Sequence, residues 1–314
     1  MTTRRVLLRS GHGGLAAGRT DPTVPTQGVR VTQPDSFAAA PPDVRELLAL
    51  ASDLALQAGR IHTEGRRRAL ELETKSSPTD VVSQVDRAAE RLIVSRLREE
   101  RPDDALLAEE GSRHDGASGV RWVIDPLDGT TNYVYGYPAY AVSIAVEIDG
   151  AARIGVVLDS SAGRLYRALA GHGAFVGDRP VHVRPATDLS HALVATGFSY
   201  DAGRRERQGA TAARVVGRVR DLRRGGSAAL DLCRVAAGEV DAYWELDLSP
   251  WDYAAGTLIA REAGAAVEHV VAAHGRGPAV VAAHPALMGP FLELLTEAGA
   301  LSPRAGRAGR PARR

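Results

Sequence analysis

The sequence is poor in the features that mark secreted, membrane-spanning or nucleic-acid-binding chains. It has one cysteine, Cys233, so an internal disulfide framework is excluded and a reducing compartment fits. No run approaches the roughly 18 to 20 apolar residues that span a bilayer, and residues 6–8 fall short of the about 7 to 15 apolar residues of a signal peptide. The 39 basic and 38 acidic residues leave a charge of +1, which gives no general reason to expect nucleic acid or a membrane as partner. We therefore expect a cytoplasmic protein.

What is present is ordinary for a globular protein. The 314 residues are 44% hydrophobic and 25% charged, enough for one large domain or two modest ones. Residues 1–42 lack sustained periodicity and are rich in Gly, Pro, Thr and Ala, which predicts a disordered extension or a misassigned start. Residues 43–298 carry the patterns of a folded domain, and 299–314 form an Arg-rich tail that is predicted to be disordered.

The periodic patterns predict a layered mixture of helices and strands. Apolar positions at helical spacing predict helices near 43–61 and 85–97. Period-two patterns between glycine-containing turns then predict an antiparallel meander, and the last third alternates again between strands and helices. The expected strands are 121–124, 141–148, 154–158, 164–168, 173–176, 181–183, 193–195, 241–244 and 279–283, and the later helices are 210–219, 228–237, 250–262 and 285–298.

The richest segment is Trp122–Asn132, where an apolar strand runs into two carboxylates. Asp125 and Asp128 are separated by a proline turn, and two carboxylates in one tight turn can share hard divalent cations, which prefer oxygen ligands. The amides of Gly129 and Thr130 could bind a phosphate oxygen if they open a helix. Taken alone, the same residues are equally typical of a solvated turn.

Further acids accompany this turn, each with an ordinary structural interpretation. Glu109-Glu110 would be the exposed end of a strand, and Asp252 would be a helix-capping acid after Ser249 and Pro250. Glu245 would be a surface acid at a strand end. Asp86 would open a helix after the loop 75–80, which contains the only lysine, Lys75. The nine histidines form no pair at metal-ligand spacing, which disfavours zinc.

Together these segments resemble the inositol monophosphatase family, part of the lithium-sensitive, metal-dependent sugar-phosphatase superfamily. The two signatures are Asp125–Thr130 and Trp251–Gly256, and the resemblance covers about residues 43–298 with every segment in order. The stretch 267–277 looks shortened, which is expected to alter a surface turn. The supporting segments are Lys75–Asp80, Asp86, Glu109-Glu110, Gly173–Gly177, Gly226–Ala229 and Glu245.

The resemblance implies a fold of the α+β class, a layered αβαβα sandwich that is usually dimeric, with two or three Mg²⁺ per site. The implied metal ligands are Glu109, Asp125, the Leu127 carbonyl, Asp128 and Asp252. Asp86 and Thr130 would orient and deprotonate the attacking water, which makes them catalytic residues together with Glu109. The implied substrate contacts are Asp128, Gly129, Thr130, Ser227, Ala228, Glu245 and Asp252, and Lys75 would lie on a loop that carries an additional metal.

The implied activity is Mg²⁺-dependent hydrolysis of inositol monophosphate or a related polyol or sugar phosphate, by direct attack of a metal-activated water. The metal-site signatures do not separate this substrate from histidinol phosphate, fructose 1,6-bisphosphate, NADP or 3′-phosphoadenosine nucleotides. A regulatory protein that binds protein or RNA, with incidental phosphatase activity, is the alternative of another class. The expected partners are a small phosphate monoester and a second copy of the chain, with no membrane, and nucleic acid is not expected.

Overall fold

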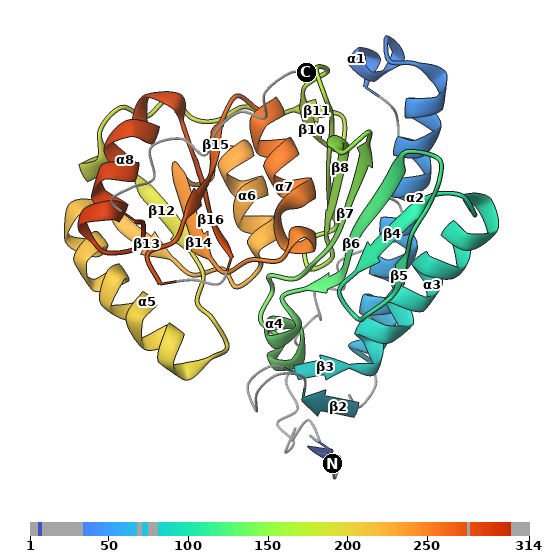
Figure 1. Cartoon of the computed structure of the whole chain (residues 1–314), viewed down its shortest axis with the longest axis horizontal. Helices are drawn as coiled ribbons and strands as arrows, with labels where there is room; N and C mark the ends of the chain where they lie inside the picture. The colour runs from blue at the N-terminus through green and yellow to red at the C-terminus, as the bar shows by residue number, and fades with distance from the viewer. Residues whose placement is uncertain (1–5, 8–33, 68–70, 75–80, 275–276, 303–314) are drawn as a thin grey trace, which may run out of the picture.

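The computed structural model describes residues 6–7, 34–67, 71–74, 81–274 and 277–302. Five layers follow one another across the molecule (Figure 1). Helices α2 (Pro42–Gly65) and α3 (Gln84–Glu100) cover one face of an eight-stranded sheet, and α6 (Ala228–Ala236) and α7 (Pro250–Glu262) cover the other. A five-stranded sheet comes next, with α5 (Ala202–Val215) and α8 (Pro285–Glu297) outside it. This arrangement confirms the predicted αβαβα sandwich.

The larger sheet is the predicted meander. Its order is β11-β10-β9-β8-β7-β6-β4-β5, and successive strands from β6 to β11 pair antiparallel, while β4 pairs parallel to β6. Of the hairpin expected after 173–176, the second strand forms at Arg179–Pro180, before the expected 181–183. The strands are β4 (Ala105–Ala108), β5 (Arg113–His114), β6 (Val120–Asp128), β7 (Ala141–Ile148), β8 (Ala151–Asp159), β9 (Arg164–Leu169), β10 (Ala174–Val176) and β11 (Arg179–Pro180).

Side-chain alternation along β7 explains why both faces of this sheet are covered. Val142, Ile144 and Val146 belong to the core under α2 and α3, whereas Ala141 and Ala145 belong to the core under α6 and α7. The small residues on the second face let α7 come close to the sheet. At Gly155 of β8, an added Cβ would lie 2.7 Å from the Ala255 carbonyl oxygen of α7. The resulting close packing fixes α7, and with it Asp252, against the sheet.

The smaller sheet has the order β13-β12-β14-β16-β15. Strands β13 and β14 pair parallel to β12, and the remaining pairs are antiparallel. The patterns predict neither edge strand, β13 nor β15, and β15 occupies part of the stretch 267–277, where an altered surface turn is expected. Both are at most half-buried, so they lack a strong apolar alternation. The strands are β12 (Leu193–Thr196), β13 (Asp221–Arg223), β14 (Ala242–Leu246), β15 (Ala266–Val271) and β16 (Pro278–Ala283).

The folded domain extends beyond both predicted boundaries, into residues before 43 and after 298. Helix α1 (Asp35–Ala38) buries Phe37 completely, with its ring 5.0 Å from that of Phe175. At the other end Leu301 is buried and bridges Ala272. One buried aromatic in a short helix creates no periodicity, so the pattern could not extend the domain to it. Residues 1–5, 8–33 and 303–314 lie outside the described chain.

A third, small sheet joins β1 (Val6–Leu7), β2 (Glu71–Thr74) and β3 (Val81–Ser83) in antiparallel pairs. The segment 75–80, which contains Lys75, lies outside the described residues. Among the described helices, none is both long and apolar enough to cross a membrane.

Candidate active site

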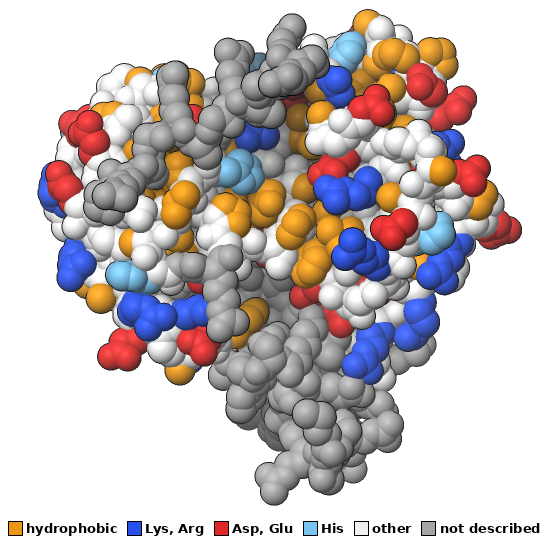
Figure 2. All heavy atoms as spheres, viewed as in Figure 1, with side chains coloured by type: hydrophobic (Ala, Val, Ile, Leu, Met, Phe, Trp, Pro, Cys, Tyr) orange, Lys and Arg blue, Asp and Glu red, His pale blue; other side chains and the backbone are white. Residues whose placement is uncertain are grey.

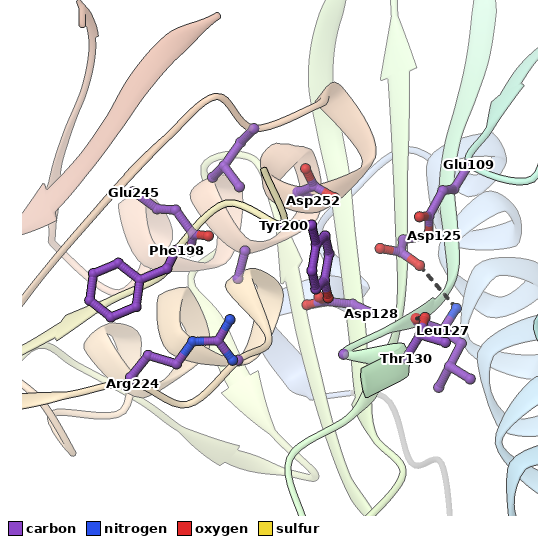
Figure 3. Close-up of a pocket in the computed structure, with 14 residues that line it drawn as sticks. Glu109, Asp125, Leu127, Asp128, Thr130, Phe198, Tyr200, Arg224, Glu245 and Asp252 are labelled. Atoms are coloured by element: carbon purple, nitrogen blue, oxygen red, sulfur yellow. Dashed lines mark hydrogen bonds between the residues drawn. The ribbon is translucent and has the colours of Figure 1, made fainter. Parts of the chain in front are cut away.

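The predicted site residues other than Asp86 and Ser227 line one hollow between the two sheets, which we call the acidic pocket. Figure 3 shows its carboxylates pointing toward one another from β6, from the end of β4 and from α7, with side chains from the smaller sheet opposite them. Its lining residues are Glu109, Asp125, Leu127, Asp128, Gly129, Thr130, Phe198, Tyr200, Arg224, Gly226, Ala228, Glu245, Leu248 and Asp252.

The end of β6 forms the turn that aims the first two carboxylates. Its pairing with β7 is regular up to Asp125 and then shifts register before Asp128, so the chain bulges between them. The Leu127 N–H donates to Oδ1 of Asp125 over 2.9 Å, which holds the turn closed (Figure 3). The bulge brings two carboxylates three residues apart to the same pocket.

Gly129 completes this turn in a conformation that other residues rarely adopt. Its φ is 88°, in the left-handed region, and an added Cβ would lie 2.8 Å from the Ala139 carbonyl oxygen. The short helix α4 (Thr130–Tyr135) begins directly after it. Gly129 and Thr130 therefore line the acidic pocket together, as the sequence predicted.

Asp86 and Thr130 are hydrogen-bonded although they lie 44 residues apart in the sequence. The Thr130 hydroxyl donates to Oδ1 of Asp86 over 2.8 Å, and the Ser83 N–H donates to the other carboxylate oxygen over 2.9 Å. Asp86 is completely buried, and burial raises the pKa of its carboxyl to about 6. The predicted catalytic pair is therefore in contact in this structure.

Glu109 reaches the pocket because its loop is fastened on both sides. Its own N–H donates to the Ile124 carbonyl oxygen of β6 over 3.2 Å. On the other side, the carboxylate of Glu90, from α3, accepts the N–H groups of Glu110 (2.8 Å) and Ser112 (3.1 Å). Sequence reasoning missed Glu90. The sequence signal that could have found it is an acid on the buried face of an amphipathic helix, since such an acid needs hydrogen-bond partners.

Asp252 both caps helix α7 and lines the acidic pocket. It stands at N3 of α7, where its carboxylate accepts the Ser249 N–H over 2.6 Å in a capping box. It also lines the acidic pocket. A capping acid in the first turn of a helix thus contributes a carboxylate to the site.

The acidic pocket holds more negative charge than its surroundings neutralise. Burial, with the neighbouring carboxylates adding to it, raises the pKa of Asp125 and of Asp252 well above the usual range. Burial also raises the pKa of Asp128 to about 7, opposed by hydrogen bonds from the Ser227 hydroxyl and the Ala229 N–H. Among the described residues that line the pocket, Arg224 is the only basic one.

This donor set suits a hard divalent cation. Four carboxylates and the Leu127 carbonyl supply only oxygen, and the excess charge favours a bound cation over a neutral ligand. In the part of the chain that the structure describes, no three Asp, Glu, His or Cys side chains are placed so that they could together hold one metal ion. The carboxylates instead surround a hollow.

The wall opposite the carboxylates differs in part from expectation. Glu245 lines the pocket and accepts a hydrogen bond from the Tyr243 hydroxyl over 2.9 Å, and burial raises the pKa of its carboxyl to about 8. Ala228 also lines it, whereas Ser227 is buried behind Asp128 and donates to its carboxylate over 2.6 Å. The lining residues that were not among the expected site residues are Phe198, Tyr200, Arg224, Gly226 and Leu248; of these, Gly226 belongs to a segment that supported the resemblance.

Comparisons with known proteins agree with this geometry. The model of the inositol monophosphatase family matches residues 43–298. The inositol-1-monophosphatase SuhB of Mycobacterium tuberculosis is 44% identical over 287 residues, which cover 87% of this chain and 99% of that protein. The chain belongs to the inositol monophosphatase family. This membership confirms the resemblance on which the site residues were chosen.

Other members of the family have similar structures and different names. The crystal structure of the extragenic suppressor protein suhB from Bartonella henselae superposes with a TM-score of 0.75 at 35% identity, covering 80% of this chain and 99% of that one. A protein of Pasteurella multocida named Nus factor SuhB is 41% identical over 224 residues, which cover 70% of this chain and 84% of that protein. Family membership supports a phosphatase, and the second name is that of a regulator.

Proposed function

We propose that the chain is a Mg²⁺-dependent phosphomonoesterase that hydrolyses inositol monophosphate or a related polyol or sugar phosphate. The observation that carries the proposal is the convergence of four carboxylates and the Asp86–Thr130 hydrogen bond on one pocket. A phosphate monoester is already anionic, so hydrolysis near these acids requires neutralising charge. The name of the mycobacterial relative supports inositol monophosphate as the first substrate to test.

Glu109, Asp125, the Leu127 carbonyl, Asp128 and Asp252 would hold two or three Mg²⁺. When bound, these ions would cancel phosphate charge, lower the pKa of water and stabilise the leaving alkoxide. The protein's own contribution is to fix five oxygen donors through the β6 bulge, the Glu109 loop and the first turn of α7.

Asp86 and Thr130 would remove the proton from the attacking water. Because the Thr130 hydroxyl donates to Asp86, its oxygen lone pairs face away from that hydrogen bond and can accept a proton from water. The water proton would pass to the Thr130 Oγ1 while the threonine proton passes to Asp86 Oδ1, which leaves hydroxide to attack phosphorus. The bond from phosphorus to the ester oxygen then breaks, and the departing alkoxide takes a proton from solvent water to become the free alcohol, while Asp86 returns its proton to solvent. The pKa of Asp86, about 6, suits an acceptor near neutral pH.

The remaining wall would bind the phosphate and the alcohol. The N–H groups of Gly129 and Thr130, at the start of α4, would hold phosphate oxygens. Asp252, Glu245, Ala228 and Ser227 would lie near the alcohol, with the hydroxyl of Ser227 keeping Asp128 in place. Cytoplasmic location and a homodimer, which the resemblance implies, belong to the same proposal.

The substrate is tested by phosphate release from a panel with Mg²⁺ present. It contains inositol 1-phosphate, histidinol phosphate, fructose 1,6-bisphosphate, NADP and 3′-phosphoadenosine 5′-phosphate. We expect inositol 1-phosphate to have the highest kcat/KM. A higher value for another compound would move the assignment to that compound with the same chemistry.

A regulatory role is the second candidate, because one relative is named Nus factor SuhB. In this alternative the chain binds protein or RNA and its phosphatase activity is incidental. The discriminating variant is Asp128→Asn, examined in a strain whose own copy is deleted. Loss of the deletion-complementing function together with hydrolysis supports the enzyme, and complementation without hydrolysis supports the regulator.

A further inference from the structure

A second hollow lies beside α5, outside the acidic pocket, and three arginines line it. Arg204, Arg207 and Arg214 are spaced three and seven residues apart on one face of the helix. Figure 2 shows arginine side chains over α5 beside a histidine. We call this hollow the arginine pocket. Its lining residues are Arg204, Arg207, Gln208, Ala210, Thr211, Arg214, Leu246, Asp247, His274 and Gly299.

The three guanidinium groups are incompletely neutralised. Arg204 lies 3.7 Å from the Asp247 carboxylate, the one acid among the described residues that line the pocket. Arg214 donates to the neutral Ala298 carbonyl over 3.0 Å. Arg207 makes no ion pair or hydrogen bond with the described chain, and the acid that acts on it electrostatically is Asp201, the N-cap of α5, which also acts on Arg204. Two carboxylates thus face three guanidinium groups. The pocket therefore carries a net positive charge, opposite in sign to that of the acidic pocket.

Two buried side chains add neutral donors to this charge. Gln208 and Thr211 are only 7% and 6% exposed. The side-chain carbonyl of Gln208 accepts the Ser199 N–H over 2.7 Å, and within the described residues nothing accepts from its amide nitrogen. The Thr211 hydroxyl is likewise unbonded to any described residue. A concave site with three arginines and two buried donors is built for a compact oxyanion.

We propose that the arginine pocket binds a phosphate group, at a site distinct from the scissile phosphate. An intermediate hollow joins it to the acidic pocket: Arg204 and Asp247 line one end, and Tyr200, Glu245 and Asp252 line the other. The bound group is therefore either the second phosphate of a doubly phosphorylated substrate or free inorganic phosphate. The first alternative rests on the proposed function, whereas the binding of free phosphate does not.

Direct binding tests the site without catalysis. Inorganic phosphate is measured by equilibrium dialysis against the full chain in EDTA, at constant ionic strength. Without divalent cations the acidic pocket repels phosphate, so the phosphate that binds reports on the arginine pocket. We expect Arg207→Ala to weaken binding about tenfold, the loss of one charge-assisted hydrogen bond.

The controls separate the pocket from general surface charge. Arg91→Ala removes an exposed arginine of α3 and should leave phosphate binding unchanged. Arg207→Lys keeps the charge and should weaken binding less than Arg207→Ala does. Because Arg207 is exposed and bonds to no described residue, these variants should fold with unchanged thermal midpoints. Equal phosphate binding by the wild type and Arg207→Ala, or none by the wild type, would overturn the proposal.

Kinetics with Mg²⁺ then identify the source of the phosphate. If it belongs to the substrate, Arg207→Ala raises KM about tenfold for inositol 1,4-bisphosphate and leaves KM for inositol 1-phosphate unchanged. If the bound group is free phosphate, Arg207→Ala changes neither KM, while equilibrium dialysis still shows weaker phosphate binding by this variant. Both results support the site. If the wild type hydrolyses neither compound, the proposed function fails, and the dialysis result still decides the pocket.

Discussion

The Thr130 hydroxyl donates to the Asp86 carboxylate over 2.8 Å, which joins the first turn of α4 to the first turn of α3. Both helices begin beside the acidic pocket. Asp86 also accepts hydrogen bonds from the Ser83 N–H and hydroxyl, so its position is set by the cap of its own helix. The residue proposed to take up the proton is thus held by local structure before any substrate binds.

Removing this pair should lower kcat with little effect on KM. We expect Asp86→Asn and Thr130→Ala each to reduce kcat about 10²- to 10⁴-fold, the usual contribution of a positioned proton acceptor. Thr130→Ser keeps the hydroxyl and should retain most of the activity. Steady-state kinetics with inositol 1-phosphate provide the measurement. Equal losses in the serine and alanine variants would show that the hydroxyl is not required.

Glu90 should affect the metal requirement although it does not line the acidic pocket. Glu90→Gln replaces one carboxylate oxygen by an amide that cannot accept, so one N–H of the Glu109 loop loses its partner. We expect the Mg²⁺ concentration for half-maximal activity to rise about 10- to 100-fold. The matched control is Glu99→Gln, at an exposed position of the same helix. An unchanged Mg²⁺ dependence in Glu90→Gln would contradict this role.

Gly129→Ala should be more damaging than an alanine at another left-handed glycine. Gly150 has a φ of 77° but nothing within 4 Å of an added Cβ, so Gly150→Ala should cost about 1–2 kcal/mol from the backbone alone. At Gly129 alanine has the same backbone cost, and the clash of its Cβ with the Ala139 carbonyl oxygen destabilises the fold further. Denaturant unfolding gives both values. A larger loss for Gly150→Ala would be evidence against the close approach.

His62 should make stability fall in weak acid. It is completely buried between the Ser160 hydroxyl and the Pro126 carbonyl, and burial lowers its pKa from 6.5 to about 4. Between those values the unfolded chain binds a proton that the folded chain does not. The contribution of His62 to the free energy of unfolding is therefore complete above pH 6.5, and about 3 kcal/mol of that free energy is lost as the pH falls toward 4.

Denaturant unfolding at a series of pH values, for wild type and His62→Gln, isolates this contribution. The difference between the two free energies of unfolding should shrink as the pH falls below 6.5. His114→Gln, at an exposed histidine, should follow the wild type. A constant difference between wild type and His62→Gln would rule out a lowered pKa.

Much of the fold follows from the sequence because its central elements are regular. Strand β7 and helix α7 begin and end at the predicted residues, since a two-residue alternation and a Ser-Pro start mark them clearly. Edge strand β15 and the single turn around Phe37 leave no such pattern. The position of β15 is set by its pairing with the neighbouring strand β16 (Pro278–Ala283). The position of the turn around Phe37 is set by the contact of its ring with Phe175, which lies far along the chain.

The site divides in the same way. Acids next to a recognisable turn or cap, such as Asp125 and Asp252, could be chosen from motifs. Arg224 could not, because it reaches the pocket only through the fold. For Glu90 the helical spacing indicates a buried acid, but not its contacts with the Glu109 loop. Ser227 is predicted to contact the substrate, and the structure shows that its hydroxyl donates to the Asp128 carboxylate.

Phosphate release from inositol 1-phosphate by the purified chain tests the central proposal most directly. It is measured with Mg²⁺, with EDTA, and again after excess Mg²⁺ is restored. We predict turnover with Mg²⁺, none with EDTA and full recovery on restoration, because the acidic pocket cannot accept a phosphate dianion without divalent cations. Undiminished turnover in EDTA, or none from a folded chain with Mg²⁺, would contradict it.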